Sequence, residues 1–103
     1  MQAYNPLTGA TTEEYVAALT LNNAMGAVLI VKNTHASETM YYKVDVYLAN
    51  TDSALKHEFV SETGLAAETA TDPIVVTYPF AKMVVSVKQN SGAGTYQIDP
   101  ATY

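Results

Sequence analysis

Two histidines, His35 and His57, are the side chains best suited to proton transfer near neutral pH in this sequence. A serine hydrolase needs a histidine that an acid orients and that reaches an exposed serine. His35 lies in a polar turn and His57 stands between Lys56 and Glu58 in an expected strand. The Gly-x-Ser-x-Gly elbow of hydrolases is also absent from the chain. We therefore expect no catalytic triad.

Metal-ligating residues are equally sparse. The chain has no cysteine, and its two histidines alone are a poor ligand supply for zinc. Asn50, Asp52 and Ser53 offer oxygen ligands of the kind that calcium takes, but the glycine and glutamate of an EF-hand loop are missing. An Asx turn that caps a hairpin is the expected role of these residues. We expect no metal and no cofactor.

The remaining chemical motifs are weak. Ten carboxylates are scattered along the chain, and no spacing singles out the pair that glycoside hydrolysis requires. Gly92-Ala93-Gly94 resembles a phosphate-cradling loop superficially, but it stands between two expected strands rather than before a helix. A hairpin loop is the expected structure there. The sequence predicts that the protein is not an enzyme, with a hydrolase based on a carboxylate pair as the remaining alternative.

Charge and hydropathy argue against two classes of partner. Ten carboxylates against five lysines, with no arginine, give a net charge of −5, which repels phosphate backbones. The longest apolar run, residues 27–31, is far too short to span a bilayer, and residues 1–6 do not resemble a secretory signal. We expect no nucleic-acid partner and no membrane partner, and a soluble protein.

Tyrosine is the residue type that stands out, with eight copies against two phenylalanines and no tryptophan. If residues 39–48 are extended, Tyr41 and Tyr47 share one side with Lys43 and Asp45. Tyrosine is enriched at protein interfaces because it joins a large apolar ring to a polar tip. The row is a candidate surface for another subunit or for a sugar ring. Shielding of the sheet by aromatic pairs is the alternative.

The elements that would position these side chains are strands. Apolar residues recur with a period of two between polar breaks that contain Gly, Pro or Asn. The pattern predicts seven strands, over residues 15–21, 27–32, 39–48, 55–60, 74–78, 80–88 and 95–99. Residues 65–70 are too short for an independent helix and are expected to form a loop. The predicted fold is all-β, a single-domain antiparallel β-sandwich of about seven strands, either immunoglobulin-like or jelly-roll.

Three of the predicted strands show which residues face the core. In 39–48 the inward-facing residues are Met40, Tyr42, Val44, Val46 and Leu48. In 80–88 the inward-facing residues alternate with an outer row that has a lysine at each end. Residues 27–31 are apolar at every position, so both faces of this strand are expected to be covered, either because it is central or because it lies under a neighbour. Its second face presents Val28 and Ile30, which need a cover.

The ends of the chain are the last candidate elements. Residues 1–13 carry only scattered apolar groups and are predicted to form an N-terminal arm, followed by the sandwich domain over 14–103. Either end is expected to dock on the domain or on another subunit. Tyr4 and Tyr103 are the aromatic residues best placed for such docking.

Residues 28–34, 64–69 and 80–96 resemble small all-β virion proteins of tailed phages and related viruses. The resemblance covers strand and turn patterns over about three-quarters of the chain. It implies a β-sandwich that multimerises on the particle as a capsid decoration or cement protein, located in the virion and assembled in the host cytoplasm. The implied partners are further copies of the chain, the major capsid protein, or both.

The interface residues that we select are Tyr4, Val28, Ile30, Tyr41, Tyr47 and Tyr103. The alternative function is a carbohydrate-binding or adhesive β-sandwich module, in which the same tyrosines stack on a glycan.

Overall fold

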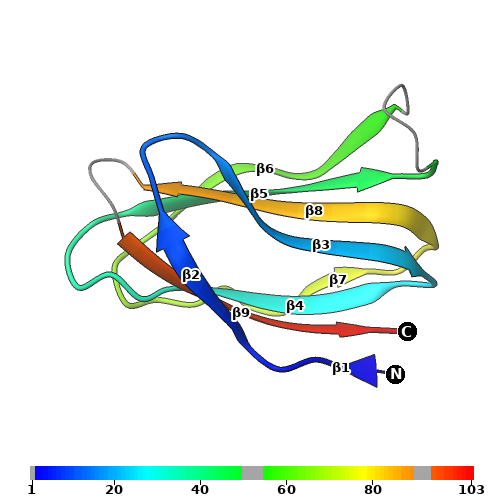
Figure 1. The fold of residues 1–103 in the computed structure, drawn as a ribbon, viewed down its shortest axis with the longest axis horizontal. Helices are drawn as coiled ribbons and strands as arrows, with labels where there is room; N and C mark the ends of the chain where they lie inside the picture. Colours follow the sequence, from blue (N-terminus) through cyan, green and yellow to red (C-terminus); the bar gives the residue numbers. More distant parts are fainter. Residues whose placement is uncertain (1, 50–54, 90–93) are drawn as a thin grey trace.

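The protein is a sandwich of two antiparallel β-sheets (Figure 1) in a computed structural model that describes residues 2–49, 55–89 and 94–103. The first sheet contains β1 (Gln2–Ala3), β2 (Leu7–Thr11), β4 (Ala27–Asn33), β7 (Ile74–Val76) and β9 (Gly94–Thr102). The second contains β3 (Val16–Ala24), β5 (Met40–Tyr47), β6 (Lys56–Leu65) and β8 (Phe80–Gln89). The all-β sandwich expected from the sequence is thus confirmed.

The order of the strands follows from the hydrogen-bonded pairs. The first sheet has the order β1-β9-β4-β7, and β2 pairs with the same side of β9 as β1 does; the second sheet has the order β3-β8-β5-β6. Every pairing is antiparallel. Within the described ranges no helix is long and apolar enough to cross a membrane.

The core lies between the inner faces of the two sheets. Alternation along β5 buries Met40, Tyr42, Val44 and Val46, as predicted. The other large side chains of this core are Leu19, Leu21, Leu29, Val31, Leu65, Val76, Phe80, Met83, Val85, Val87, Tyr96 and Ile98. Leu48 differs from the prediction, because β5 ends at Tyr47 and the Leu48 side chain is 72% exposed.

Strand β4 is central, as its apolar run indicates. It pairs with β9 along its whole length and with β7 over Ala27–Leu29. Beyond β7, its free edge is covered by the segment around Thr71, whose N–H donates to the Val31 carbonyl at 2.9 Å. Val28 and Ile30 on the outer face are half-buried rather than fully covered.

The described residues form nine strands rather than the predicted number of about seven. The two extra strands, β1 and β2, fall within the predicted N-terminal arm and pair with β9 in the first sheet. Their side chains are mostly exposed, so main-chain hydrogen bonds to β9 define them rather than an apolar period. The Tyr4 N–H extends this pairing with a hydrogen bond of 3.1 Å to the Pro100 carbonyl.

The last connection also differs from expectation. Residues 90–93 of the predicted hairpin loop lie outside the described residues, but the strands on either side belong to different sheets. Strands β8 and β9 therefore form no hairpin, and the chain crosses from one sheet to the other at this point. The predicted Asx turn of Asn50, Asp52 and Ser53 also lies outside the described residues.

A buried polar cluster closes one end of the sandwich. Asn33, Thr11 and Gln89 are each 0–1% exposed. The Gln89 amide donates to the carbonyls of Glu38 and Thr39, at 3.1 and 3.2 Å. The Asn33 amide donates to the carbonyls of Glu38 and Leu65, at 2.7 and 3.0 Å. The cluster therefore satisfies the main chain of two connections between the sheets.

Candidate binding surfaces on the two sheets

The outer face of the second sheet carries the aromatic and charged row that the sequence predicts. Tyr41 pairs with Lys88 of β8, and Tyr47 pairs with Lys82 of the same strand. Paired residues point to the same side of a sheet, so the lysines of β8 stand beside the tyrosines of β5. We call this surface the tyrosine–lysine face; it comprises Tyr15, Tyr41, Lys43, Asp45, Tyr47, Lys56, Glu58, Glu62, Lys82 and Lys88.

Lysine ammonium groups lie over the tyrosine rings of this face. The Nζ of Lys82 is 4.4 Å from the ring centroid of Tyr47. The ring of Tyr15 carries Lys43 at 4.5 Å and Lys88 at 4.9 Å. These are cation–π distances, and each such contact contributes about 0.5–1 kcal/mol at an exposed site. The contacts hold the lysines in place above the sheet.

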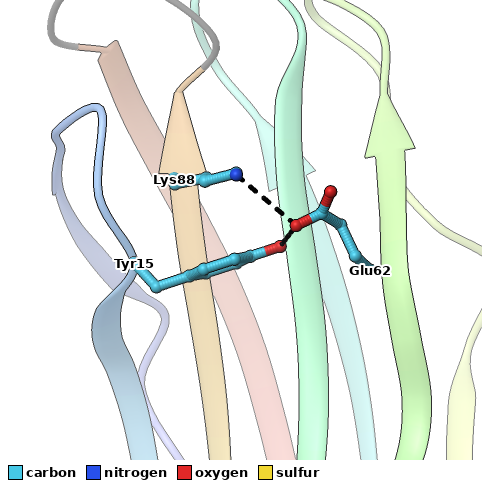
Figure 2. A network of polar contacts seen from close by, with 3 residues as sticks. All are labelled: Tyr15, Glu62 and Lys88. Carbon is cyan, nitrogen blue, oxygen red and sulfur yellow. Dashed lines mark hydrogen bonds and ion pairs between the residues drawn. The ribbon is translucent and has the colours of Figure 1, made fainter.

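Three side chains from three strand regions meet above β5 (Figure 2). The Tyr15 hydroxyl donates to Oε2 of Glu62, and the same oxygen lies 3.5 Å from Nζ of Lys88. The hydrogen bond from Tyr15 and the charge of Lys88 lower the pKa of Glu62. Burial, and then the hydrogen bond and charge of Glu62, raise the pKa of Tyr15. The group shows that this part of the face accommodates a carboxylate.

Asp45 is an unusual member of the face because it is 4% exposed. Its Oδ2 lies 4.0 Å from Nζ of Lys56, and its Oδ1 is buried without a hydrogen-bond partner among the described residues. Glu58 is its cross-strand neighbour on β6. A buried carboxylate oxygen without a hydrogen-bond donor costs free energy, so Asp45 is expected to lower the stability of the fold.

The outer face of the first sheet and its adjoining end form the second candidate surface. Val28 pairs with Ala101 and Val75, and Ile30 pairs with Asp99. Near the end where both termini lie (Figure 1), Tyr4 is 41% and Tyr103 is 56% exposed. The Tyr103 main chain is held by hydrogen bonds with Met25 and Gly26. The surface combines these apolar and aromatic side chains with two exposed charged residues, Asp99 and Lys32.

The six predicted interface residues therefore divide between two surfaces. Tyr41 and Tyr47 lie on the tyrosine–lysine face, whereas Val28, Ile30, Tyr4 and Tyr103 belong to the first sheet and its end. Sequence reasoning placed Lys82 and Lys88 at the ends of an outer row, but it did not include Tyr15 or Glu62 in the site. No local signal shows that these two meet, because 47 positions separate them and the strand order brings them together.

Both histidines make ordinary contacts with neighbouring residues of the fold. Nδ1 of His35 accepts hydrogen bonds from the main-chain N–H groups of Ser37 and Glu38, both at 3.0 Å. The ring of His57 packs edge-on against Phe59 with centroids 6.4 Å apart. The described residues contain no group of three or more His, Asp or Glu side chains that could hold a metal ion.

Comparisons with known proteins show a shared fold without a shared family. No protein-family model and no curated protein sequence matches this chain. The fold is similar to that of PirA, with a TM-score of 0.73 and 8% identity over 93% of both chains. It is also similar to the Yersinia pseudotuberculosis-derived mitogen, with a TM-score of 0.62 and 12% identity over 96% of this chain and 85% of that one.

A third similar structure is a chain of the T13 viral particle of infectious bursal disease virus, with a TM-score of 0.52 and 12% identity. The match covers 98% of this chain and 30% of the viral one, so this chain spans less than a third of that protein. Identities this low establish the sandwich architecture alone.

Proposed function

We propose that this protein is a structural virion component, a capsid decoration or cement protein that binds its own copies, the major capsid protein, or both. The proposal is carried by the half-exposed aromatic residues Tyr41 and Tyr47 on a continuous four-stranded sheet face. Tyrosine-rich, partly apolar faces are typical of protein interfaces. The similar sandwich in the viral particle is in agreement with this role.

The first sheet supplies a second surface for the same role. Val28 and Ile30 leave apolar area half-exposed beside Tyr103. Contiguous apolar area of this kind on a small protein marks an interaction site. A component with two separate faces can contact two neighbours in a lattice, which is the requirement for a protein that ties capsid subunits together.

Light scattering of the purified protein over a range of concentration and salt tests the proposal. Trimers or larger assemblies are the expected result. Tyr41→Ala and Tyr47→Ala should weaken assembly while leaving the β-spectrum in circular dichroism unchanged. Thr8→Ala, an exposed change on β2, is the control that should assemble normally. A strict monomer that also fails to bind virion shells would overturn the proposal.

The second candidate function is a carbohydrate-binding or adhesive module. The flat rings of Tyr41 and Tyr47 on an open sheet face favour it, since aromatic rings stack on sugars. The lysine above Tyr47 argues against neutral sugars, because a sugar must displace it to reach the ring. Binding of the monomer to a glycan array, lost in Tyr41→Ala, would favour this function over the first.

A further inference from the structure

We propose that copies of this chain associate head to tail, with an acidic end of one copy seated on the tyrosine–lysine face of the next. The inference rests on the proposed function, because it names the contact by which the component would assemble. It follows from the distribution of charge, because lysines are concentrated on the tyrosine–lysine face and carboxylates on the rest of the molecule.

The lysines are concentrated on one face of an acidic protein. Four of the five lysines belong to the tyrosine–lysine face, together with three of the ten carboxylates. The remainder of the chain holds one lysine and seven carboxylates. By this count the face carries a net charge of +1 and the remainder of the chain a net charge of −6, so a second copy offers the face an oppositely charged surface.

Two of these lysines are held over tyrosine rings, and the charge of one of them, Lys43, also acts on Glu62. Lys88 pairs with Glu62 and Lys56 with Asp45, but Lys43 and Lys82 form no ion pair with any residue that the structure describes. Their ammonium groups are instead held over Tyr15 and Tyr47. The register places Lys82 beside Tyr47, four residues along β5 from Lys43, so the two positions are offset by about 13 Å along the strand direction.

A lysine side chain that is already held over a tyrosine ring loses less conformational entropy when it binds a partner. A lysine side chain normally loses rotamer freedom when it forms an interface, and a ring contact made beforehand reduces that loss. Glu62 shows the kind of group that such a site takes, since its carboxylate is bound by the Tyr15 hydroxyl and by Lys88. A carboxylate from a second copy is expected to bind Lys43 and Lys82 in the same manner.

The acidic end comprises Glu13, Glu14, Glu38 and Glu68. These residues lie in the β2–β3, β4–β5 and β6–β7 connections, which meet at one end of the sandwich (Figure 1). Hydrogen bonds hold the connections together: Gln89 donates to the carbonyls of Thr12 and Glu38, and the Asn33 N–H donates to that of Thr69. Glu13, Glu14 and Glu68 are exposed to solvent.

The contact joins two different patches, so it is heterologous. A heterologous contact leaves one patch of each kind free at the two ends of a dimer. Further copies then add until the rotation closes a ring, or else a filament grows. The inference therefore predicts assemblies larger than dimers, and their formation is weakened by salt because exposed charges are screened.

A charge-swap experiment on the full chain tests the contact. One variant reverses the face with Lys43→Glu and Lys82→Glu, and the other reverses the acidic end with Glu14→Lys and Glu68→Lys. Each variant alone should associate at least tenfold more weakly than the wild type in light scattering. An equimolar mixture should recover association, because each variant then meets a surface of opposite charge.

Single changes provide controls of equal net charge. Lys82→Gln is compared with Thr8→Glu, and Glu68→Gln with Thr8→Lys, at an exposed position of β2; only the first member of each pair should weaken association. Circular dichroism and thermal unfolding verify that each variant is folded.

The outcomes separate this inference from the proposed function. If the wild type assembles but the reversed variants assemble equally well, or the mixture recovers nothing, the head-to-tail contact is wrong and the structural role stands. If the wild type stays monomeric at low salt and binds no virion shell, the structural role itself is wrong.

Discussion

The Thr11 hydroxyl donates a hydrogen bond of 2.9 Å to Oε1 of Gln89, which links β2 of the first sheet to β8 of the second. Both side chains are buried, and the Thr11 hydroxyl also accepts a hydrogen bond from the Gly94 N–H at 3.0 Å. Gln89 thus uses its amide oxygen and nitrogen on two different chain segments, β2 and the β4–β5 connection. A buried polar group that is fully paired in this way fixes the arrangement of the segments around it.

Gln89→Leu should destabilise the fold by about 2–4 kcal/mol, because it removes, in a buried site, the acceptor of the Thr11 hydroxyl and the side-chain donor to the Thr39 carbonyl. Urea unfolding followed by circular dichroism measures the change. Gln97→Leu is the matched control: its amide donates to Asp99 at the surface, so a change within about 0.5 kcal/mol is expected. Equal losses in the two variants would contradict the role given to the cluster.

Gly9→Ala should loosen the N-terminal strands from β9. A Cβ at Gly9 would fall on the hydroxyl and ring carbons of Tyr96, which is 9% exposed and packs against the core. Either the ring or β2 must move, and a thermal transition lowered by several degrees is expected. Gly64→Ala is the control, since its Cβ would meet the Tyr41 ring at an ordinary 3.4 Å. Proteolysis within residues 1–13 in the Gly9 variant alone would agree with detachment.

The sandwich was predictable because its main strands have a clear period of two. Residues 40–47 show this directly, with the inward and outward sets as expected. Strands β1 and β2 carry no such period, since their pairing with β9 is made by main-chain hydrogen bonds. Alternation within one strand also explains which site residues could be predicted. Tyr41 and Tyr47 follow from alternation in a single strand. The contact of Tyr15 with Glu62 was missed because it depends on the order of four strands.

Asp45→Asn should raise the free energy of unfolding by about 1 kcal/mol. The change keeps the size of the side chain and removes a buried charge whose cross-strand neighbour is Glu58 and whose Oδ1 has no donor among the residues that the structure describes. Chemical denaturation at pH 7 gives the measurement. Asp99→Asn on the exposed side of β9 should change stability by less than about 0.5 kcal/mol. A marked loss of stability in Asp45→Asn would mean that the attraction of Lys56 exceeds the cost of burial.

Tyr15→Phe should raise the pKa of Glu62 toward its usual range, because the hydrogen bond from the Tyr15 hydroxyl is the main cause of the lowered value. Carboxyl titration by nuclear magnetic resonance follows this change directly. A lowered folded-state pKa stabilises the fold above the unfolded value and loses its effect as the pH falls below about 4.3. The wild type should therefore lose more stability than the variant on acidification below that value. Tyr41→Phe, whose ring faces the same Lys88, is the control and should leave the Glu62 titration in place. An unchanged titration in Tyr15→Phe would show that Lys88, rather than Tyr15, sets the state of this carboxylate.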